Sequence, residues 1–186
     1  PDVGDPVLES EHLSGLHFTG STGTFQHLWK SIAENIEHYN TYPRIVGETG
    51  GKDFIFAHES ADVDAVVIAA IRAAYEYQGQ KCSAASRMYV PESIWEEFRD
   101  KLLAEVKNVK YGDVEDFTNF MGAVIDRKAF EKISGYIDYA KESDDAEILF
   151  GGNYDDSMGY FIEPTIVQTS DPKFKLMEEE IFGPVL

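Results

Sequence analysis

The 186-residue sequence predicts an α/β protein, because short strands and amphipathic helices alternate along it. Apolar runs bounded by Gly, Pro and Ser indicate the strands, and between them apolar residues recur every three or four positions, as on the buried face of a helix. The 43% hydrophobic content is enough for one sizeable core or for parts of two domains. Such alternation is typical of largely parallel sheets.

The first quarter of the chain predicts the order strand, turn, helix, strand. The predicted elements are a strand at 13–19, a turn with a helix N-cap at 20–23, a helix from 25 to about 36 and a strand at 44–47. The segment from Phe18 to Thr22 resembles the turn between strand and helix in dinucleotide-binding folds. In those folds, phosphate meets the free N–H groups of the helix N-terminus at this turn. Alone it is a weak signal, because such turns are common in α/β proteins.

The alternation continues to the end of the chain. The predicted elements are a strand at 54–57, helices at 62–77, 91–107 and 127–141, strands at 87–90 and 147–150, a polar loop at 151–159 and a strand within 160–168. Asp62 is a typical N-cap, and Gly79 is well placed to end the helix that Asp62 begins. Pro164 interrupts the last strand, which indicates an edge or a bulge there.

Composition excludes several classes of function. The formal charge of −18, from 34 acidic and 16 basic side chains, repels phosphate backbones and anionic lipids, so we expect no nucleic-acid or membrane partner. No apolar run approaches the roughly 20 residues that span a bilayer. The single cysteine cannot form an internal disulfide, which indicates a reducing compartment, and it argues against a structural metal site.

Cys82 and Glu48 are the candidate catalytic residues. A lone cysteine is usually a small buried hydrophobe, but Cys82 follows a helix in a polar loop, with Lys81 beside it as a cation that can favour the thiolate. A loop glutamate is usually a solvated surface acid, yet Glu48 lies between an apolar strand and two glycines that admit close backbone approach. A carboxylate there could activate water for attack on a thioester.

Four ordered segments carry a resemblance to a known family. They are Phe-Thr-Gly-Ser at 18–21, Glu-Thr-Gly-Gly-Lys at 48–52, Gly-Gln-Lys-Cys at 79–82 and Glu-Glu-Ile-Phe-Gly-Pro at 179–184. In this order, and with this spacing from Glu48 to Cys82, they resemble signature segments of the aldehyde dehydrogenase superfamily. The resemblance extends over essentially the whole chain. It implies the end of a Rossmann-like cofactor domain at 1–48, followed at 49–186 by the α/β catalytic domain, incomplete at its C-terminus.

The resemblance implies a role for each matching residue and NAD as cofactor. Cys82 would attack the aldehyde, and Glu48 would activate the water that hydrolyses the thioester. Gly20 and Ser21 would meet the cofactor pyrophosphate. Glu180 would hold the nicotinamide ribose and Phe182 would pack beside the nicotinamide ring, although by themselves they are only a surface acid and a core aromatic.

Three stretches resemble one branch of that superfamily more closely. Residues 27–30, 47–54 and 79–84 are most similar to 1-pyrroline-5-carboxylate (glutamate semialdehyde) dehydrogenases, NAD-dependent enzymes of proline catabolism. By that resemblance Ser83, with Lys81, would bind the carboxylate of a small aldehyde substrate; a plain core serine is the alternative. The branch also implies a homo-oligomer in the mitochondrial matrix, or in the cytoplasm for a bacterial source.

Other functions remain open at this point. One is another semialdehyde dehydrogenase, including a coenzyme-A-acylating one, although the presence of Glu48 argues against that. Another is a non-catalytic fragment or interaction domain. We expect the chain to be a fragment and a poor catalyst alone, because the resemblance places the asparagine of the oxyanion hole, the first strands of the cofactor domain and the oligomerisation segments outside it.

Overall fold

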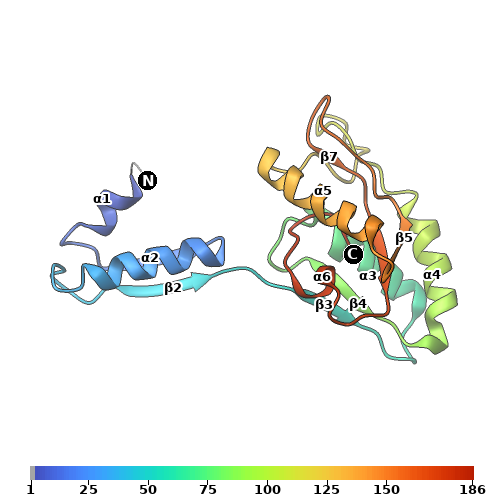
Figure 1. Ribbon diagram of the computed structural model, residues 1–186, viewed down its shortest axis with the longest axis horizontal. Helices are drawn as coiled ribbons and strands as arrows, with labels where there is room; N and C mark the ends of the chain where they lie inside the picture. The colour runs from blue at the N-terminus through green and yellow to red at the C-terminus, as the bar shows by residue number, and fades with distance from the viewer. Residues whose placement is uncertain (1–2) are drawn as a thin grey trace. The chain divides into compact units, whose positions relative to one another are not determined.

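A computed structural model describes residues 3–186, which fall into two compact units, Pro1–Gly50 and Gly51–Leu186 (Figure 1). Helices and strands alternate in both, so the predicted α/β class is confirmed. Within residues 3–186 no helix combines the length and the apolar character that crossing a membrane would require.

The first unit is a strand-helix-strand motif preceded by a short helix. Its elements are α1 (Gly4–Leu8), β1 (Gly15–Thr19), α2 (Thr22–Glu34) and β2 (Arg44–Glu48). β1 and β2 pair in parallel, with Thr19 opposite Glu48. Leu8, Leu13 and Ile32 form a small buried core between α1, α2 and the strands. Because the strands are parallel, their carboxyl ends, where Gly20 and Glu48 lie, share one edge.

The second unit contains the rest of the chain. Its elements are β3 (Asp53–Phe56), α3 (Val63–Tyr75), the turn η1 (Glu76–Gly79), β4 (Ala85–Tyr89), α4 (Glu92–Val106), α5 (Arg127–Glu142), β5 (Ala146–Phe150), β6 (Tyr154–Asp155), β7 (Phe161–Ile162), β8 (Ile166–Thr169) and α6 (Lys175–Glu178). Strand β3 pairs with β4 in parallel, whereas the pairs β5–β8 and β6–β7 are antiparallel.

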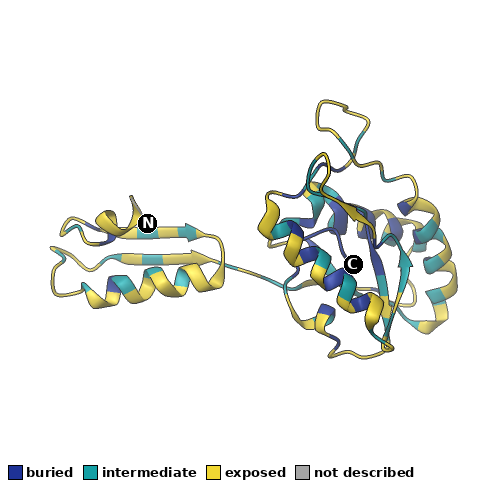
Figure 2. Ribbon diagram, turned by 45° about the horizontal axis from the view of Figure 1, so that its top comes forward, coloured by how far each residue is buried: buried dark blue, intermediate teal, exposed yellow. Residues whose placement is uncertain are grey.

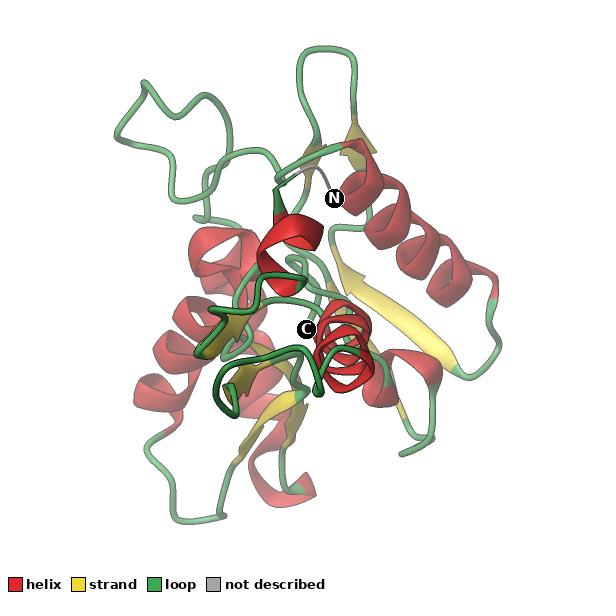
Figure 3. Ribbon diagram, turned by 90° about the vertical axis from the view of Figure 1, so that its left-hand side faces the viewer, coloured by secondary structure: helices red, strands yellow, loops and turns green. Residues whose placement is uncertain are grey.

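Two apolar clusters hold this unit together on opposite faces of its strands. Figure 2 shows the buried residues of the helices that form them, and Figure 3 shows the same elements from another side. One joins α3 and α4 through Val67, Tyr75 and Phe98, and Ile166 of β8 belongs to it. The other is built on Ile133 of α5, with the segment after α6 packed against it. Helix α5 therefore covers one side and helices α3 and α4 the other. The Tyr75 hydroxyl lies inside and donates to the Thr165 carbonyl at 3.0 Å.

Several sequence predictions need correction. The sheets are not largely parallel, because β6 and β7 are joined by a short loop, and such a loop permits only antiparallel pairing. The predicted loop at 151–159 contains β6, and the four-residue helix α6 was not predicted. The helix predicted at 62–77 ends at Tyr75, two residues before the backbone turns left-handed at Tyr77. Pro164 does interrupt the last strand, since it separates β7 from β8.

Candidate active site

The turn before α2 has the geometry of a phosphate-binding turn. The Ser21 hydroxyl caps the helix by accepting a hydrogen bond from the Thr24 N–H at 3.2 Å, and the Gly20 N–H donates to the Glu48 carbonyl at 3.0 Å. No acidic residue lies in the first turn of α2, and a Cβ placed at Gly23 would meet open space. The amides and the positive end of the helix dipole can therefore face an anion.

Glu48 ends β2 beside this turn. The hydrogen bond from Gly20 fixes its backbone, while its side chain is exposed. The first unit thus brings together three of the predicted site residues, Gly20, Ser21 and Glu48. Glu48 and Cys82 belong to different units, so their pairing remains a prediction.

Cys82 lies in the loop between η1 and β4, and its thiol is free and exposed. Because Asp53 of β3 is opposite Ala85 of β4, the segments that precede these parallel strands lie side by side. A Cβ at Gly51 would come within 2.8 Å of the Cys82 carbonyl oxygen, so this approach requires a glycine. The second glycine of the Gly50-Gly51 pair therefore packs against the thiol loop.

Lys81 is not a free cation beside the thiol. Its amine lies 2.8 Å from the Glu76 carboxylate and 5.9 Å from the centre of the Tyr77 ring. The hydrogen bond from Lys81, followed by the charge of that amine, lowers the pKa of Glu76. The sequence prediction of an unpaired cation beside the thiol is therefore wrong. The neighbouring Ser83 is exposed, and within residues 3–186 its hydroxyl has no hydrogen-bond partner.

Glu180 is joined to the glycine that packs against the thiol loop. Its Oε1 atom accepts a hydrogen bond from the Gly51 N–H at 3.1 Å, and its carbonyl accepts one from Lys132 at 2.7 Å. Phe182 has a φ of 61°, and a positive φ is unusual for a bulky residue and indicates local strain. Its side chain is 38% exposed. The second unit therefore gathers the backbone of Cys82, Gly51 and the carboxylate of Glu180.

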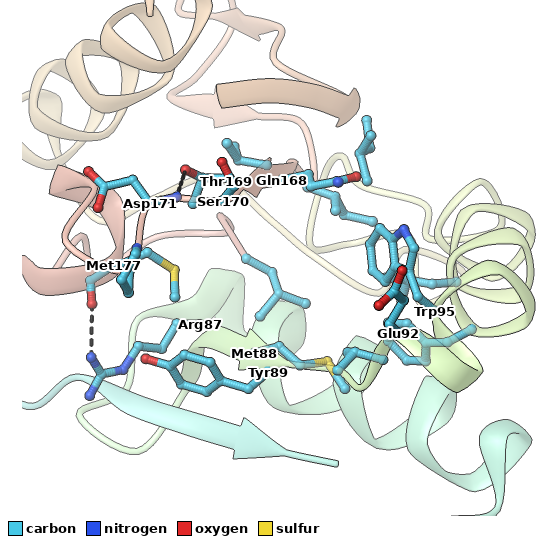
Figure 4. Close-up of a pocket in the computed structure, with 18 residues that line it drawn as sticks. Arg87, Met88, Tyr89, Glu92, Trp95, Gln168, Thr169, Ser170, Asp171 and Met177 are labelled. Atoms are coloured by element: carbon cyan, nitrogen blue, oxygen red, sulfur yellow. Dashed lines mark hydrogen bonds between the residues drawn. The ribbon is translucent and has the colours of Figure 1, made fainter. Parts of the chain in front are cut away.

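Sequence reasoning missed two basic residues that support this region. The Lys52 amine donates to the Ser86 carbonyl at 3.1 Å, and burial, followed by the nearby charge of Arg87, lowers its pKa to about 8. Arg87 donates to the Met177 carbonyl at 3.0 Å (Figure 4). It also lies over the Phe54 ring. The position of Lys52 directly after Gly50 and Gly51 of the motif could have indicated that it belongs to the site. Arg87 occupies a strand position that predicts only a solvated side chain.

Arg87 also lines a cavity among the described residues. This cavity has a volume of about 430 Å³ and lies between β4 and β8, lined by Met88, Trp95 and Met177 among others (Figure 4). None of the predicted catalytic or cofactor residues lines it. Within residues 3–186 no group of His, Cys, Asp and Glu side chains is arranged to hold a metal ion.

Comparison with known proteins gives one consistent result. The sequence matches the aldehyde dehydrogenase family over residues 1–186. It is 56% identical to the mitochondrial Delta-1-pyrroline-5-carboxylate dehydrogenase of Danio rerio, covering 100% of this chain and 34% of that protein. It is 53% identical to the mitochondrial enzyme of that name from Homo sapiens, covering 100% of this chain and 33% of that protein.

Solved structures agree with the sequence relatives. The Delta-pyrroline-5-carboxylate dehydrogenase of Mycobacterium tuberculosis bound with NAD matches with a TM-score of 0.92 at 48% identity, over 99% of this chain and 33% of that one. The 1-pyrroline-5-carboxylate dehydrogenase from Thermus with bound NAD matches with a TM-score of 0.89 at 32% identity, over 99% and 35%. The chain thus spans about a third of the length of these relatives. The resemblance seen in the sequence is confirmed, and the chain belongs to the aldehyde dehydrogenase family.

Proposed function

We propose that the protein carrying this chain oxidises glutamate semialdehyde, formed from 1-pyrroline-5-carboxylate, to glutamate with NAD. The observation that carries the proposal is the exposed Cys82 thiol in a loop packed on Gly51, within a chain 48–56% identical to dehydrogenases named for that substrate. We further propose that residues 1–48 end the NAD-binding domain and that residues 49–186 belong to the catalytic domain.

The proposed reaction begins at Cys82. Its thiolate adds to the aldehyde carbon, and the carbonyl oxygen becomes an oxyanion that the Cys82 backbone N–H can stabilise as half of an oxyanion hole. NAD, when bound, supplies the acceptor for the hydride that leaves this carbon. Loss of the hydride converts the hemithioacetal into a thioester on Cys82, and the carbonyl double bond re-forms.

Glu48 acts in the second half of the reaction. Its carboxylate removes a proton from water, the resulting hydroxide adds to the thioester carbon, and the Cys82 thiolate leaves as the acid forms. Glu48 is exposed at the carboxyl end of β2, where a water can reach it. A coenzyme-A-acylating enzyme would not need this base, so the carboxylate favours hydrolysis.

The chain offers chemically suitable groups for NAD. The N-terminus of α2, with Gly20 and Ser21, presents amides for the pyrophosphate, and an open space at Gly23 admits it. Glu180 can accept from ribose hydroxyls through its second carboxylate oxygen, because only Oε1 is engaged with Gly51. Phe182 can offer part of its ring to the nicotinamide, since the side chain is partly exposed.

Substrate recognition is assigned to Ser83 and Lys81. The unpartnered Ser83 hydroxyl can donate to the substrate carboxylate, and such a charge-assisted bond contributes about 1.5–3 kcal/mol. Lys81 would reach the carboxylate only by leaving Glu76. We also propose that the full-length protein is a homo-oligomer, and that it lies in the mitochondrial matrix, or in the cytoplasm if its source is bacterial. The names of its eukaryotic relatives, which include the word mitochondrial, support the first location.

The test measures kcat/KM in the full-length protein for glutamate semialdehyde and for an uncharged aldehyde of similar length. Ser83→Ala should lower the value for glutamate semialdehyde by about tenfold to a hundredfold and affect the uncharged aldehyde far less. Ser93→Ala, an exposed serine of α4, is the matched control. Cys82→Ala should abolish NADH formation with both substrates.

Two outcomes would overturn the proposal. Equal losses for both aldehydes in Ser83→Ala would remove the mechanistic reason for a carboxylate-bearing substrate. Activity near wild type in Cys82→Ala would remove the nucleophile itself.

A further inference from the structure

The chain between helix α3 and Cys82 adopts an unusual backbone conformation. Tyr77, Gln78 and Gly79 have φ values of 59°, 57° and 65°, so three consecutive residues lie in the left-handed region. This region is unfavourable for a non-glycine residue, because Cβ comes too close to the following carbonyl oxygen, and it is normally visited by single residues. The left-handed turn 77–79 must therefore be held by contacts from elsewhere in the unit.

Two glutamines supply those contacts, and both reach the same distant segment. The Gln78 Nε2 atom donates to the Ala123 carbonyl at 2.9 Å, and the Gln80 Oε1 atom accepts from the Ile125 N–H at 3.0 Å. Gly122 makes room for the Gln78 amide, because a Cβ there would lie 3.3 Å from Nε2. The partners dictate the orientation of each amide, since a carbonyl can only accept and an N–H can only donate.

Gly79, between the two glutamines, is packed on both sides. A Cβ at this position would collide with the Gly183 carbonyl and would lie 2.7 Å from the Ala74 carbonyl. The turn thus contacts the residue that follows Phe182 while its glutamines hold residues 123–125. Cys82 comes only two residues after Gln80, so a shift of the turn moves the thiol and its backbone N–H.

We propose that Gln78 and Gln80 are positioning residues for the Cys82 nucleophile. They act through the backbone: their amides fix the left-handed turn 77–79 on residues 123–125, and the turn sets where the thiol meets the aldehyde. This inference rests on the proposed function of Cys82. A misplacement of the nucleophile by about 1 Å can cost a hundredfold in rate.

The directions of the two hydrogen bonds provide a sharp test in the full-length protein. Gln80→Glu keeps an oxygen that can accept from Ile125, so kcat should stay within about threefold of wild type. Gln78→Glu replaces the donor with a carboxylate facing the Ala123 carbonyl, so kcat should fall by about tenfold to a hundredfold. Both variants add one negative charge near Cys82, Gln80→Glu two residues before it and Gln78→Glu four residues before it. A difference in kcat between them therefore cannot come from the added charge alone. Gln80→Ala should lose activity that Gln80→Glu retains.

Controls separate positioning from folding. Gln168→Glu, an exposed glutamine of β8, should leave kcat unchanged. Gln78→Gly removes the amide but suits a positive φ, so it should fold at least as well as Gln78→Ala and still lose activity. Melting temperatures identify the folded fraction of each variant, and kcat is measured well below them.

Three results would overturn the inference. The first is an equal loss of kcat in Gln78→Glu and Gln80→Glu. The second is a kcat within threefold of wild type in every variant of Gln78 and Gln80. The third is a loss of kcat that disappears after correction for the folded fraction. Full activity in Cys82→Ala would instead refute the proposed function, whatever the glutamine variants do. Loss in Cys82→Ala with no effect of the glutamines would refute this inference alone.

Discussion

One turn in this chain contains predicted site residues and another leads to one, and the two turns are held in different ways. At 20–21, Ser21 has an ordinary φ of −71° and caps its own helix by accepting from an amide three residues away, and the Gly20 N–H adds one hydrogen bond to the Glu48 carbonyl. The turn 77–79 before Cys82 is left-handed, and it is fixed by hydrogen bonds to residues 45 positions later in the chain. A helix cap that local sequence supplies defines the first turn, whereas side-chain hydrogen bonds to a distant segment hold the second.

Glycine substitutions should give the largest difference between the two turns. Gly79→Ala requires a positive φ and collides with backbone, so it should lower the free energy of unfolding of the second unit by about 2–4 kcal/mol. In Gly23→Ala the added Cβ meets open space in the first turn of α2. This substitution should raise the free energy of unfolding of the first unit by about 0.5 kcal/mol.

Each unit contains one tryptophan, which makes this comparison measurable. Urea unfolding followed by Trp29 fluorescence reports the first unit, and Trp95 reports the second, in variants whose other tryptophan is replaced by phenylalanine. A cost below about 0.5 kcal/mol for Gly79→Ala would mean that the left-handed turn is not rigidly held.

Lys52 provides a smaller effect that depends on pH. Burial lowers the pKa of Lys52 to about 8 from its ordinary value of 10.5. The positive charges of Arg87 and Lys132 also lower this pKa, and the negative charge of Glu180 raises it. Between these two values the unfolded chain binds more protons than the folded one, so the free energy of unfolding gains a contribution that rises with pH. Below about pH 8 the desolvated cation reduces stability.

The measurement compares wild type with Lys52→Met in urea at pH 7.5 and at pH 9.5. The wild type should gain stability relative to the variant at the higher pH, because only the wild type carries the buried amine. A difference that stays constant or falls with pH would show that Lys52 is as hydrated in the folded protein as in the unfolded chain.

The same contrast explains what could be predicted from sequence. The elements around Ser21 follow from a cap and an apolar period, and Asp62 and Asp126 likewise cap the helices that follow them. The left-handed turn, the antiparallel strands and helix α6 depend on contacts between distant segments. Nothing in the local pattern indicates that Gln78 would reach residue 123.

The candidate site divides in the same manner. Glu48 and Cys82 were identified from their motifs, whereas Lys52 and Arg87 emerged only when burial and carbonyl partners were known. Lys81 was identified as a cation beside the thiol, but its ion pair with Glu76 could not be foreseen, because that pairing depends on the backbone conformation at 77–79.

Pre-steady-state kinetics of Glu48→Gln tests the central claim most directly, namely that Cys82 and Glu48 act in successive halves of one reaction. In the full-length protein, the variant should form a burst of about one NADH per site and then turn over at least about a hundredfold more slowly than wild type, because only hydrolysis of the thioester needs the base. Glu37→Gln, an exposed glutamate of the same unit, should behave as wild type. An equal loss of burst and steady-state rate in Glu48→Gln would contradict the assignment.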